Sequence, residues 1–366
     1  MRVVHLTSTH PADDVRIFVK ECRSLVKAGL DVHLVAPGAG NETRDGVAVH
    51  GFTPTTGPRL LRVPRRLGRA WSAARSLHPD LCHFHEPELV PVALGLKLAG
   101  ARIVYDVHED HSSTLAYSAF RSPGRRLGFR LLEALARRAC DGFVAATPAI
   151  ARRLPPGRTI ELLNYPVLEE LVAEPAPAAG RTDAGYVGLI SRARGAREMV
   201  EAAGRVRDPA SRLVLIGSFD TPELEQEIRS LAGWERVDYL GRLGRRELGE
   251  RLAAARVGLV ILHPERNYLE SFPTKLFEYM GAGLPAIVSD FPFFRELVEP
   301  IGCAVFVDPL DPAQLAATVD ELLADERRTQ EMGRRGAEAV RDRLNWEQQA
   351  PKLVALYRRV MPETAA

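Results

Sequence analysis

Residues 269–285, LESFPTKLFEYMGAGLP, decide the fold of the second half of the chain. Proline is favoured at the first position of a helix, so the pattern predicts a helix that begins near Pro273. Gly283 and Pro285 then end it. Just upstream, the apolar run Val257–Leu262 is typical of a buried parallel strand. A strand, a polar loop at 263–272 and a helix form one β-α unit, and its loop lies at the strand's carboxyl end, where ligands bind in α/β sheets.

The same alternation of strands and helices runs along most of the chain. Short β-branched runs such as RVVHLT, DVHLVAP and LCHFH precede amphipathic stretches in the first half, and AGYVGLI, RLVLIGS and VDYLG do so in the second. Residues 167–183 are rich in Ala, Pro and Glu and have no clear period. We therefore expect an α/β protein with two Rossmann-like, doubly wound domains facing across a cleft: residues 1–166, a linker at 167–183, residues 184–345, and a terminal helix at 346–366 that packs back on the first domain.

Composition narrows the class of protein. No apolar run approaches the roughly 20 residues that span a bilayer, and residues 1–11 lack the pattern of a secretory signal, so we expect a cytoplasmic protein. The four cysteines are far apart and predict neither disulfides nor a zinc knuckle. Residues 1–165 hold 23 Lys and Arg against 15 Asp and Glu, a net +8, whereas residues 166–366 hold 26 against 32, a net −6. A basic first half favours an anionic neighbour, either a membrane surface or an acidic ligand, or else a solvated basic face.

The loop and helix around residue 273 have the residue types of an anion site flanked by hydroxyl-binding groups. Free amides from Ser271 to Lys275 and the positive end of the helix suit a diphosphate, and Lys275 adds a charge. Glu270 and Glu278 stand on either side of this site. Carboxylates there would accept hydrogen bonds from hydroxyl groups, so the pattern indicates a nucleotide sugar. A solvated Glu278 and a simple loop charge at Glu270 remain the alternative.

The segment ESFPTKLFE resembles the E-x7-E element of family 4 retaining glycosyltransferases, which have the two-domain GT-B architecture. Further stretches resemble the same family, in the same order: HPADDVRIFVKECRSLVKAGLDV, HFHEPEL, YDVHED, NYP, YVGLISRARG and PTKLFEYMGAGLPAIVSD. The resemblance covers nearly the whole chain. It implies a glycosyltransferase that acts in the assembly of polysaccharides, glycolipids or other glycoconjugates, with a UDP-sugar as the favoured donor and a GDP-sugar next.

The resemblance also implies roles for single residues. Glu270 would bind the donor sugar and Glu278 the ribose, while His108 would face the sugar from the first domain. The donor's nucleotide and diphosphate would be held by Gly188, Arg194, Gly241, Ser271, Phe272, Pro273, Thr274, Lys275 and Glu278. Many relatives carry Arg directly after the glycine at position 188, where this chain has Leu189. Arg192 or Arg194 could supply the missing charge to the leaving diphosphate, or form an ordinary surface ion pair.

In this mechanism the chain provides no covalent nucleophile. A phosphate oxygen takes the proton of the acceptor hydroxyl, and arginine, lysine and amides replace the divalent metal of other transferases. We therefore expect no cofactor and no metal. The acceptor would be a sugar, a lipid-linked molecule or another small molecule. Its candidate contacts lie at the ligand edge of the first domain, and they are Asp13, Asp14, Arg16, His85 and Glu86; helix capping explains Asp14 equally well.

Two basic segments predict a possible membrane contact. The helix expected near 125–139 carries several arginines around a leucine stripe, and residues 59–75 are arginine-rich and free of acidic residues. Both could rest on anionic lipid and hold the enzyme at the inner face of a membrane. Core packing of the stripe with a solvated basic face is the alternative.

Three other functions fit parts of the pattern. A zinc-dependent hydrolase could use His83, His85, Asp106, His108 and His111 as ligands, since alternation puts His83 and His85 on one face of a strand. A nucleotide-sugar 2-epimerase would share the GT-B fold. A catalytically silent nucleotide-sugar binder is disfavoured by the joint presence of His108, Arg194, Glu270 and Glu278.

Overall fold

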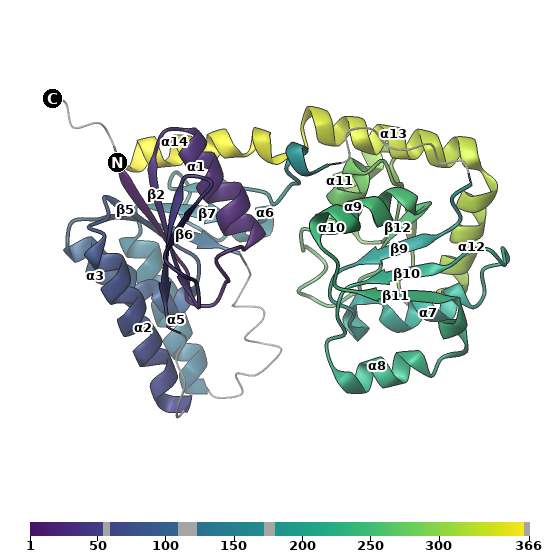
Figure 1. The fold of residues 1–366 in the computed structure, drawn as a ribbon, viewed down its shortest axis with the longest axis horizontal. Helices are drawn as coiled ribbons and strands as arrows, with labels where there is room; N and C mark the ends of the chain where they lie inside the picture. Colours follow the sequence, from purple (N-terminus) through teal and green to yellow (C-terminus); the bar gives the residue numbers. More distant parts are fainter. Residues whose placement is uncertain (54–58, 109–122, 172–179, 362–366) are drawn as a thin grey trace. The chain divides into compact units, whose positions relative to one another are not determined.

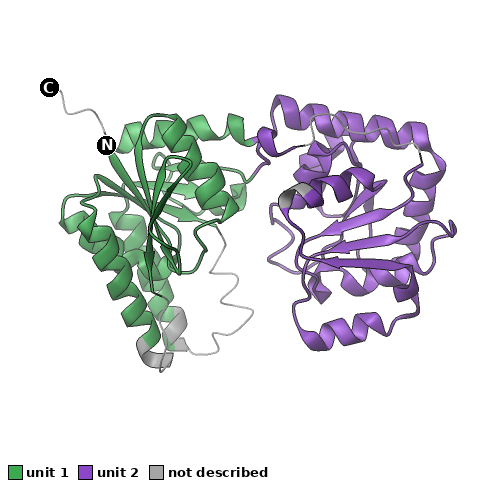
Figure 2. Ribbon diagram, viewed as in Figure 1, with its two compact units in different colours: residues 1–164, 346–366 green, residues 165–345 purple. Residues whose placement is uncertain are grey.

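The computed structural model describes residues 1–53, 59–108, 123–171 and 180–361. They form two compact units, which are coloured separately in Figure 2. Unit 1 contains residues 1–164 and the segment that begins at Trp346, and unit 2 contains Tyr165–Asn345. Both are parallel α/β units, as the alternation of strands and helices predicts (Figure 1).

Unit 1 is built on an eight-stranded sheet with the order β3-β4-β2-β1-β5-β6-β7-β8. Its strands are β1 (Arg2–Leu6), β2 (Asp31–Pro37), β3 (Glu42–Arg44), β4 (Val47–Phe52), β5 (Leu81–Phe84), β6 (Arg102–Val107), β7 (Gly142–Ala145) and β8 (Thr159–Glu161). Only the β3–β4 pair is antiparallel. The strand order reverses at β1, so the ends of β1 and β5 form the switch point where ligands bind in such sheets.

Helices cover both faces of this sheet. One face is covered by α2 (Arg59–Ser76), α3 (Val90–Leu98) and α5 (Pro123–Ala139), whose apolar side chains join the core made by Val4, Phe84 and other strand residues. The other face carries a π-helical segment, η1 (Val15–Cys22), which continues into α1 (Arg23–Lys27), together with α14 (Ala350–Val360). The short helix α6 (Pro148–Ala151) contacts β7 and β8. Residues Val15–Cys22 of this continuous stretch are π-helical, and only Arg23–Lys27 are α-helical.

The segment from Trp346 onward is anchored on unit 1. A short 3-10 turn (Trp346–Gln348) precedes α14. The indole nitrogen of Trp346 donates to the carbonyl of Lys20 at 3.0 Å and to Ser24 Oγ at 2.8 Å. Tyr357, fully buried in α14, reaches the sheet through a hydrogen bond with His83.

Unit 2 has a six-stranded parallel sheet with the order β11-β10-β9-β12-β13-β14. The strands are β9 (Ala184–Val187), β10 (Leu213–Ile216), β11 (Val237–Gly241), β12 (Val257–Val260), β13 (Ala286–Ser289) and β14 (Ala304–Val307), and the helices are α7 (Ala196–Ala203), α8 (Pro222–Arg229), α9 (Arg245–Ala254), α10 (Thr274–Gly281), α11 (Pro292–Val298), α12 (Pro312–Ala324) and α13 (Glu326–Asp342). The strand order reverses between β9 and β12, which places the ligand edge at the loops that follow these two strands.

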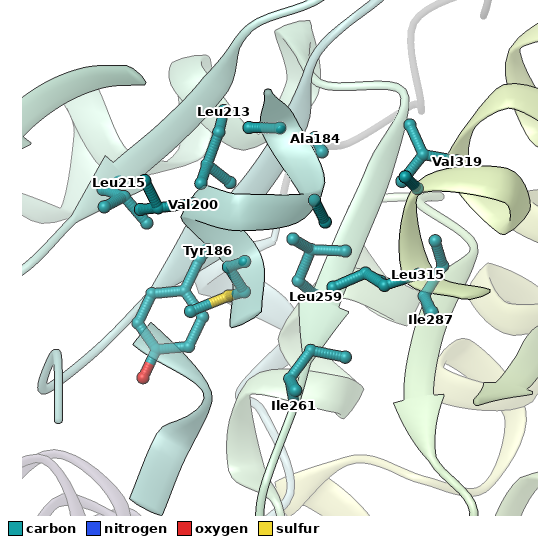
Figure 3. Packing of buried hydrophobic residues seen from close by; sticks show 14 of the residues in the cluster. Ala184, Tyr186, Val200, Leu213, Leu215, Leu259, Ile261, Ile287, Leu315 and Val319 are labelled. Carbon is teal, nitrogen blue, oxygen red and sulfur yellow. The ribbon is translucent and has the colours of Figure 1, made fainter. Parts of the chain in front are cut away.

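One core cluster of unit 2 lies between this sheet and the helices α7 and α12. Figure 3 shows Leu213, Leu259 and Ile287 from the strands against Val200 of α7 and Leu315 of α12. Tyr186 of β9 joins the core through its ring. Its hydroxyl donates to the carbonyl of Leu189 at 2.6 Å, so the residue holds the turn that follows its own strand.

Candidate functional site

The ligand edge of unit 2 brings two cationic side chains to one glycine. A Cβ atom placed on Gly188 would lie 3.4 Å from Lys275 Nζ and 3.8 Å from Arg194 Nη1. Gly188 follows β9, Arg194 ends the next short turn and Lys275 opens α10 after β12. The two neighbouring strands at the switch point therefore deliver one cation each, as an anion site requires.

The ammonium group of Lys275 is held without an acceptor. Its Nζ is shielded from solvent and, among the residues described, finds no hydrogen-bond partner. It lies 3.7 Å from the ring centroid of Tyr186. Burial, reinforced by the positive charge of Arg194, lowers the pKa of Lys275 well below its usual value. Two adjacent cations repel each other, and a bound diphosphate would relieve both this repulsion and the missing hydrogen bonds of Lys275.

Glycine backbone beside these cations leaves room for a nucleotide. Gly188 has φ +126° and Gly217 has φ +143°, conformations that side chains rarely tolerate. A pocket of about 290 Å³ lies beside them; its lining is Val187, Gly188, Leu189, Ile216, Gly217, Ser218, Arg242, Leu243 and Leu248. Gly241, expected to bind the donor, directly precedes Arg242 of this lining and has φ +65°. The predicted glycines thus flank one pocket, while the lining residues Arg242, Leu243 and Leu248 were missed because no motif marks them.

The start of α10 differs in detail from the prediction. Pro273 is the N-cap rather than the first helical residue, with φ −81° and ψ 86°, and its carbonyl accepts from the amide of Leu276 at 2.9 Å. The prediction that amides are free from Ser271 onward is wrong at Ser271, because both its amide and its hydroxyl donate to the carbonyl of Tyr268. The amides of Phe272, Thr274 and Lys275 donate to no acceptor within the described residues. The helix ends as expected, with Gly283 at φ +71°.

Three other predicted site residues of this element, Glu270, Phe272 and Glu278, differ in their exposure and contacts. Glu270 and Glu278 are both exposed, Glu270 in the loop and Glu278 in α10. The ring of Phe272 stacks on Phe277 with centroids 4.7 Å apart, so its side chain serves packing and only its amide is available to a ligand. An exposed carboxylate on each side of the helix start is compatible with hydroxyl binding, and the structure gives neither group a buried structural role.

Arg192 is not at this site. Its guanidinium is largely exposed and forms an ion pair with Glu227, with Nη1 2.8 Å from Oε1. Arg194, two residues further on, lies against the phenol groups of Tyr186 and Tyr268, and its Nε is buried without an acceptor among the described residues. The geometry therefore favours Arg194 for phosphate and assigns Arg192 the surface ion pair that the sequence left open.

In unit 1, His108 follows β6 at the ligand edge and is fixed by a buried carboxylate. Its Nε2 lies 2.7 Å from Asp106 Oδ2 and 3.1 Å from His85 Nδ1, and 17% of its side chain is exposed. Although burial opposes ionisation, Arg16 and then His108 hold the pKa of Asp106 well below its usual value. Asp106 therefore remains a carboxylate and keeps a proton on the facing nitrogen of His108.

The expected acceptor contacts of Arg16 and Asp14 are corrected by the structure. The buried Arg16 guanidinium donates to both oxygens of Asp106, at 2.9 and 3.0 Å, and to the carbonyl of Leu162. Asp14 accepts from the amides of Arg16 and Ile17 and so caps the π-helical segment, which was the alternative. Asp13 is exposed, and the N-cap of this segment is Asp14. Arg16 thus positions Asp106, and through it His108.

Glu86 organises the loop that follows β1. Its carboxylate accepts from the amides of Ser8 and Thr9, from the hydroxyls of Thr7 and Thr9 and from His10 Nδ1 at 2.8 Å. Although burial opposes it, these hydrogen bonds, led by that from His10, lower the pKa of Glu86 to about 2. The bond to Glu86 raises the pKa of His10, whose ring centroid lies 5.4 Å from that of His108.

Two conclusions follow for the acceptor edge. With both oxygens engaged by the loop, Glu86 positions His10 rather than facing a ligand itself. His10 is a partly exposed histidine beside His108 and is the residue that was missed. Its place just after β1, at the switch point of the sheet, was the available signal.

The histidines of the hydrolase alternative are buried. His83 and His85 do lie on one face, with ring centroids 4.8 Å apart, but they are 0% and 2% exposed. His111 lies outside the described residues. His85, Asp106 and His108 could form a three-residue metal group, but Arg16 already occupies both oxygens of Asp106. The carboxylate of this set is therefore already paired with a cation of the chain.

Comparisons with known proteins agree with the fold. Residues 15–157 match the family model described as Glycosyltransferase Family 4, and residues 169–339 match the one described as Glycosyl transferases group 1. Together these segments span most of both units. With the fold, they identify the chain as a glycosyltransferase with two parallel-sheet domains of the GT-B type.

Relatives and solved structures give the scale of the similarity. A phosphatidyl-myo-inositol mannosyltransferase of Mycobacterium leprae is 28% identical over 294 residues, which cover 77% of this chain and 74% of that protein. The sucrose-phosphate synthase of Thermosynechococcus elongatus superposes with a TM-score of 0.79 at 20% identity, with 99% of each chain covered. Anabaena HepE in complex with UDP-glucose gives a TM-score of 0.75 at 17% identity over 98% of this chain and 99% of that one.

Proposed function

We propose that the protein is a retaining hexosyltransferase that moves a sugar from a nucleotide-sugar donor to an acceptor hydroxyl. The observation that carries the proposal is the pair of cations at Gly188: Lys275 without an acceptor and Arg194 beside it. A UDP-sugar is the favoured donor and a GDP-sugar the next. The HepE complex, which holds UDP-glucose on the same fold, supports a nucleotide sugar as the ligand class.

The geometry suits the departure of a nucleoside diphosphate. As the bond to the anomeric carbon breaks, negative charge grows on the β-phosphate, and Lys275, Arg194 and the free amides at the start of α10 would stabilise it. Because cations of the chain supply this charge, we propose that transfer requires no divalent metal at the phosphates. A phosphate oxygen then accepts the proton of the attacking hydroxyl, with retention of configuration.

The carboxylates and histidine have the roles that the family resemblance implies. Glu270 binds hydroxyls of the donor sugar and Glu278 the ribose, which agrees with their exposure on either side of the helix start. His108 contacts the sugar, and its tautomer is fixed by Asp106. His10 and Asp13 remain available to the acceptor at the same edge of unit 1.

A test begins with binding and ends with the product. Thermal-shift and calorimetric titrations with UDP, GDP and their sugars, in the presence of EDTA, should show one nucleotide that stabilises the protein. NMR of the product then reports whether the anomeric configuration is retained. Donor incubated alone separates the epimerase alternative, since an epimer rather than nucleotide release would appear. If no uridine or guanosine nucleotide binds, the proposal is wrong.

Exposed leucines favour a membrane-bound or lipid-linked acceptor. Leu127, Leu131 and Leu135 follow one another at every fourth residue of α5 and are 60%, 61% and 45% exposed. Core packing of this stripe, the alternative at the sequence level, therefore does not hold for these three. Exposed Arg130, like the arginines that end the helix, could contact anionic headgroups. The inositol lipid in the name of the mycobacterial relative supports the same class of acceptor. Flotation with anionic vesicles tests it, with a Leu131→Glu variant as the matched control; failure to float would remove membrane contact.

Within the described ranges, none of the helices combines the length and apolar character needed to cross a bilayer. The proposed contact is accordingly peripheral.

A further inference from the structure

Four potential metal ligands meet inside unit 1. They are His5 of β1, Glu21 of the π-helical segment, and His83 and His85 at the end of β5, and they are 0–2% exposed. The parallel register places His5 directly opposite His83. One ligand atom from each residue lies within 4.8 Å of all the others.

The distances between these atoms fit a small metal ion. His5 Nδ1 lies 3.1 Å from His85 Nε2 and 3.7 Å from Glu21 Oε2, and His83 Nδ1 lies 3.9 Å from the same oxygen. Zinc holds nitrogen and oxygen ligands at about 2.0–2.2 Å in a tetrahedron, which sets neighbouring ligand atoms roughly 3.4 Å apart. The observed spacings bracket this value, so small side-chain shifts suffice to close the site.

Buried polar atoms in the cluster are left unsatisfied. Neither carboxylate oxygen of Glu21 accepts a hydrogen bond, and His83 Nε2 has no partner, among the residues that the structure describes. Arg16 Nε approaches Glu21 Oε1 to 3.2 Å, but its hydrogen is donated to Asp106. A buried carboxylate without partners is costly, and a cation would satisfy it. On His83 the ion would bind Nδ1 and replace the 2.7 Å contact of this atom with Tyr357 Oη.

The surroundings have the form of an outer ligand shell. Metal-bound histidines usually donate their second nitrogen to an oxygen or carboxylate. Tyr357 Oη lies 3.1 Å from His5 Nε2, and Asp106 Oδ2 lies 3.5 Å from His85 Nδ1.

We propose that His5, Glu21, His83 and His85 bind one zinc ion that fastens the π-helical segment to strands β1 and β5. Three imidazoles and a carboxylate are donors that zinc accepts, and full burial without an open position marks a structural rather than a catalytic centre. The site is distinct from the metal-free phosphate chemistry proposed for unit 2. Through His85 it also borders His108, so the ion would fix the orientation of that histidine.

The test is metal analysis of the full-length protein, purified without a polyhistidine tag from zinc-supplemented medium. We expect one zinc per chain that survives dialysis against EDTA. The variants Glu21→Gln and His83→Gln should lose it. His33→Gln is the matched control: it removes a histidine that contacts another histidine, His50, at 2.9 Å in the same sheet, and it should retain the buried ion.

A second measurement does not depend on the variants folding. Wild-type protein is unfolded in guanidinium with EDTA and refolded with Co²⁺, with Zn²⁺ or with neither. Uptake of one Co²⁺ with the visible absorption of four-coordinate cobalt, and a higher Tm with either metal, support the proposal. Folded wild-type protein that contains no zinc and refolds to the same Tm with and without metal would overturn it. Zinc lost from His33→Gln but kept in Glu21→Gln would assign the ion to the surface pair and also overturn it.

Discussion

Replacing Lys275 by methionine should stabilise the protein and at the same time weaken nucleotide binding. Methionine keeps the length and packing of the side chain but removes the ammonium group, which is shielded from solvent without a hydrogen-bond acceptor and lies next to Arg194. In the free protein this charge lowers the stability of the fold. In the complex it would increase the affinity for the diphosphate.

The size of both effects can be set from the contacts. An unpaired buried charge costs several kcal/mol, and stacking on Tyr186 at 3.7 Å returns about 2 kcal/mol of that. We expect a net gain of about 1–2 kcal/mol from the substitution, which for a unit of this size raises Tm by roughly 2–8 °C. Loss of a charge-assisted hydrogen bond to phosphate costs about 1.5–3 kcal/mol, or roughly 10- to 150-fold in the Kd for UDP.

The gain should depend on pH in a defined direction. The folded-state pKa of Lys275 is lowered relative to the unfolded chain, so its destabilising effect is complete below the folded value. It disappears as pH rises toward the unfolded value near about 10.4. The Tm difference between Lys275→Met and the wild type should therefore shrink as the buffer is changed from pH 7 to pH 10.

Differential scanning fluorimetry and calorimetric titration with UDP and GDP test these expectations, with Lys352→Met as the control. Lys352 contacts Gln349 in unit 1, and its loss should change neither quantity. A misfolded variant would lose stability and binding together, so higher Tm with weaker binding is diagnostic. A lower Tm with unchanged nucleotide affinity would refute the reasoning that this ammonium group binds the diphosphate.

Three further substitutions test other parts of the site. Arg194→Ala should weaken nucleotide binding at least tenfold by calorimetry, whereas Arg192→Ala, which breaks only an exposed ion pair, should change Kd less than about twofold. Gly217→Ala should destabilise the protein by more than about 3 kcal/mol in urea unfolding, because its φ is +143° and a Cβ would lie 1.9 Å from the carbonyl oxygen of Gly188; a stable variant would show that the loop can move apart. Asp106→Asn removes the negative charge that pairs with the buried guanidinium of Arg16 and should lower the free energy of unfolding by about 3–5 kcal/mol. It should also lower kcat by a larger factor than it changes KM. An unchanged kcat would show that His108 takes no part in the reaction.

The fold was predictable because its signals are local. Short β-branched runs end at Gly, Pro or Asp and alternate with amphipathic segments, and this alternation alone defines two parallel α/β units. The element from Glu270 to Glu278 was found for the same reason, since its glycine and proline stops place it at the end of a strand. The role of Lys275 in anion binding could be predicted from its position at the start of that helix.

The roles of individual charges were not predictable, because distant partners decide them. Arg192 and Arg194 lie in the same short turn, and only Glu227, on α8, distinguishes them. Arg16 stands at the ligand edge by sequence, yet Asp106 on β6 draws its guanidinium into the interior. Sequence also placed His83 and His85 on one face, but gave no sign that His5 and Glu21 complete a group with them.

The two units differ in whether their buried charged side chains have partners within the chain, and this difference distinguishes structural groups from ligand-binding groups. In unit 1 the buried Arg16 and Asp106 neutralise each other, and every oxygen of Glu86 is occupied by the loop, so these groups are already satisfied by the chain. In unit 2 the ammonium group of Lys275 has no hydrogen-bond acceptor among the described residues, and it lies at the switch point of the sheet, after β12. A polar group that the fold satisfies fixes the fold, whereas one that it leaves unsatisfied creates affinity for a ligand of opposite charge. By this criterion the donor's phosphates belong at Lys275. Glu21 is an exception within unit 1, because its buried carboxyl oxygens have no hydrogen-bond partner among the described residues, and it is there that we propose a cation.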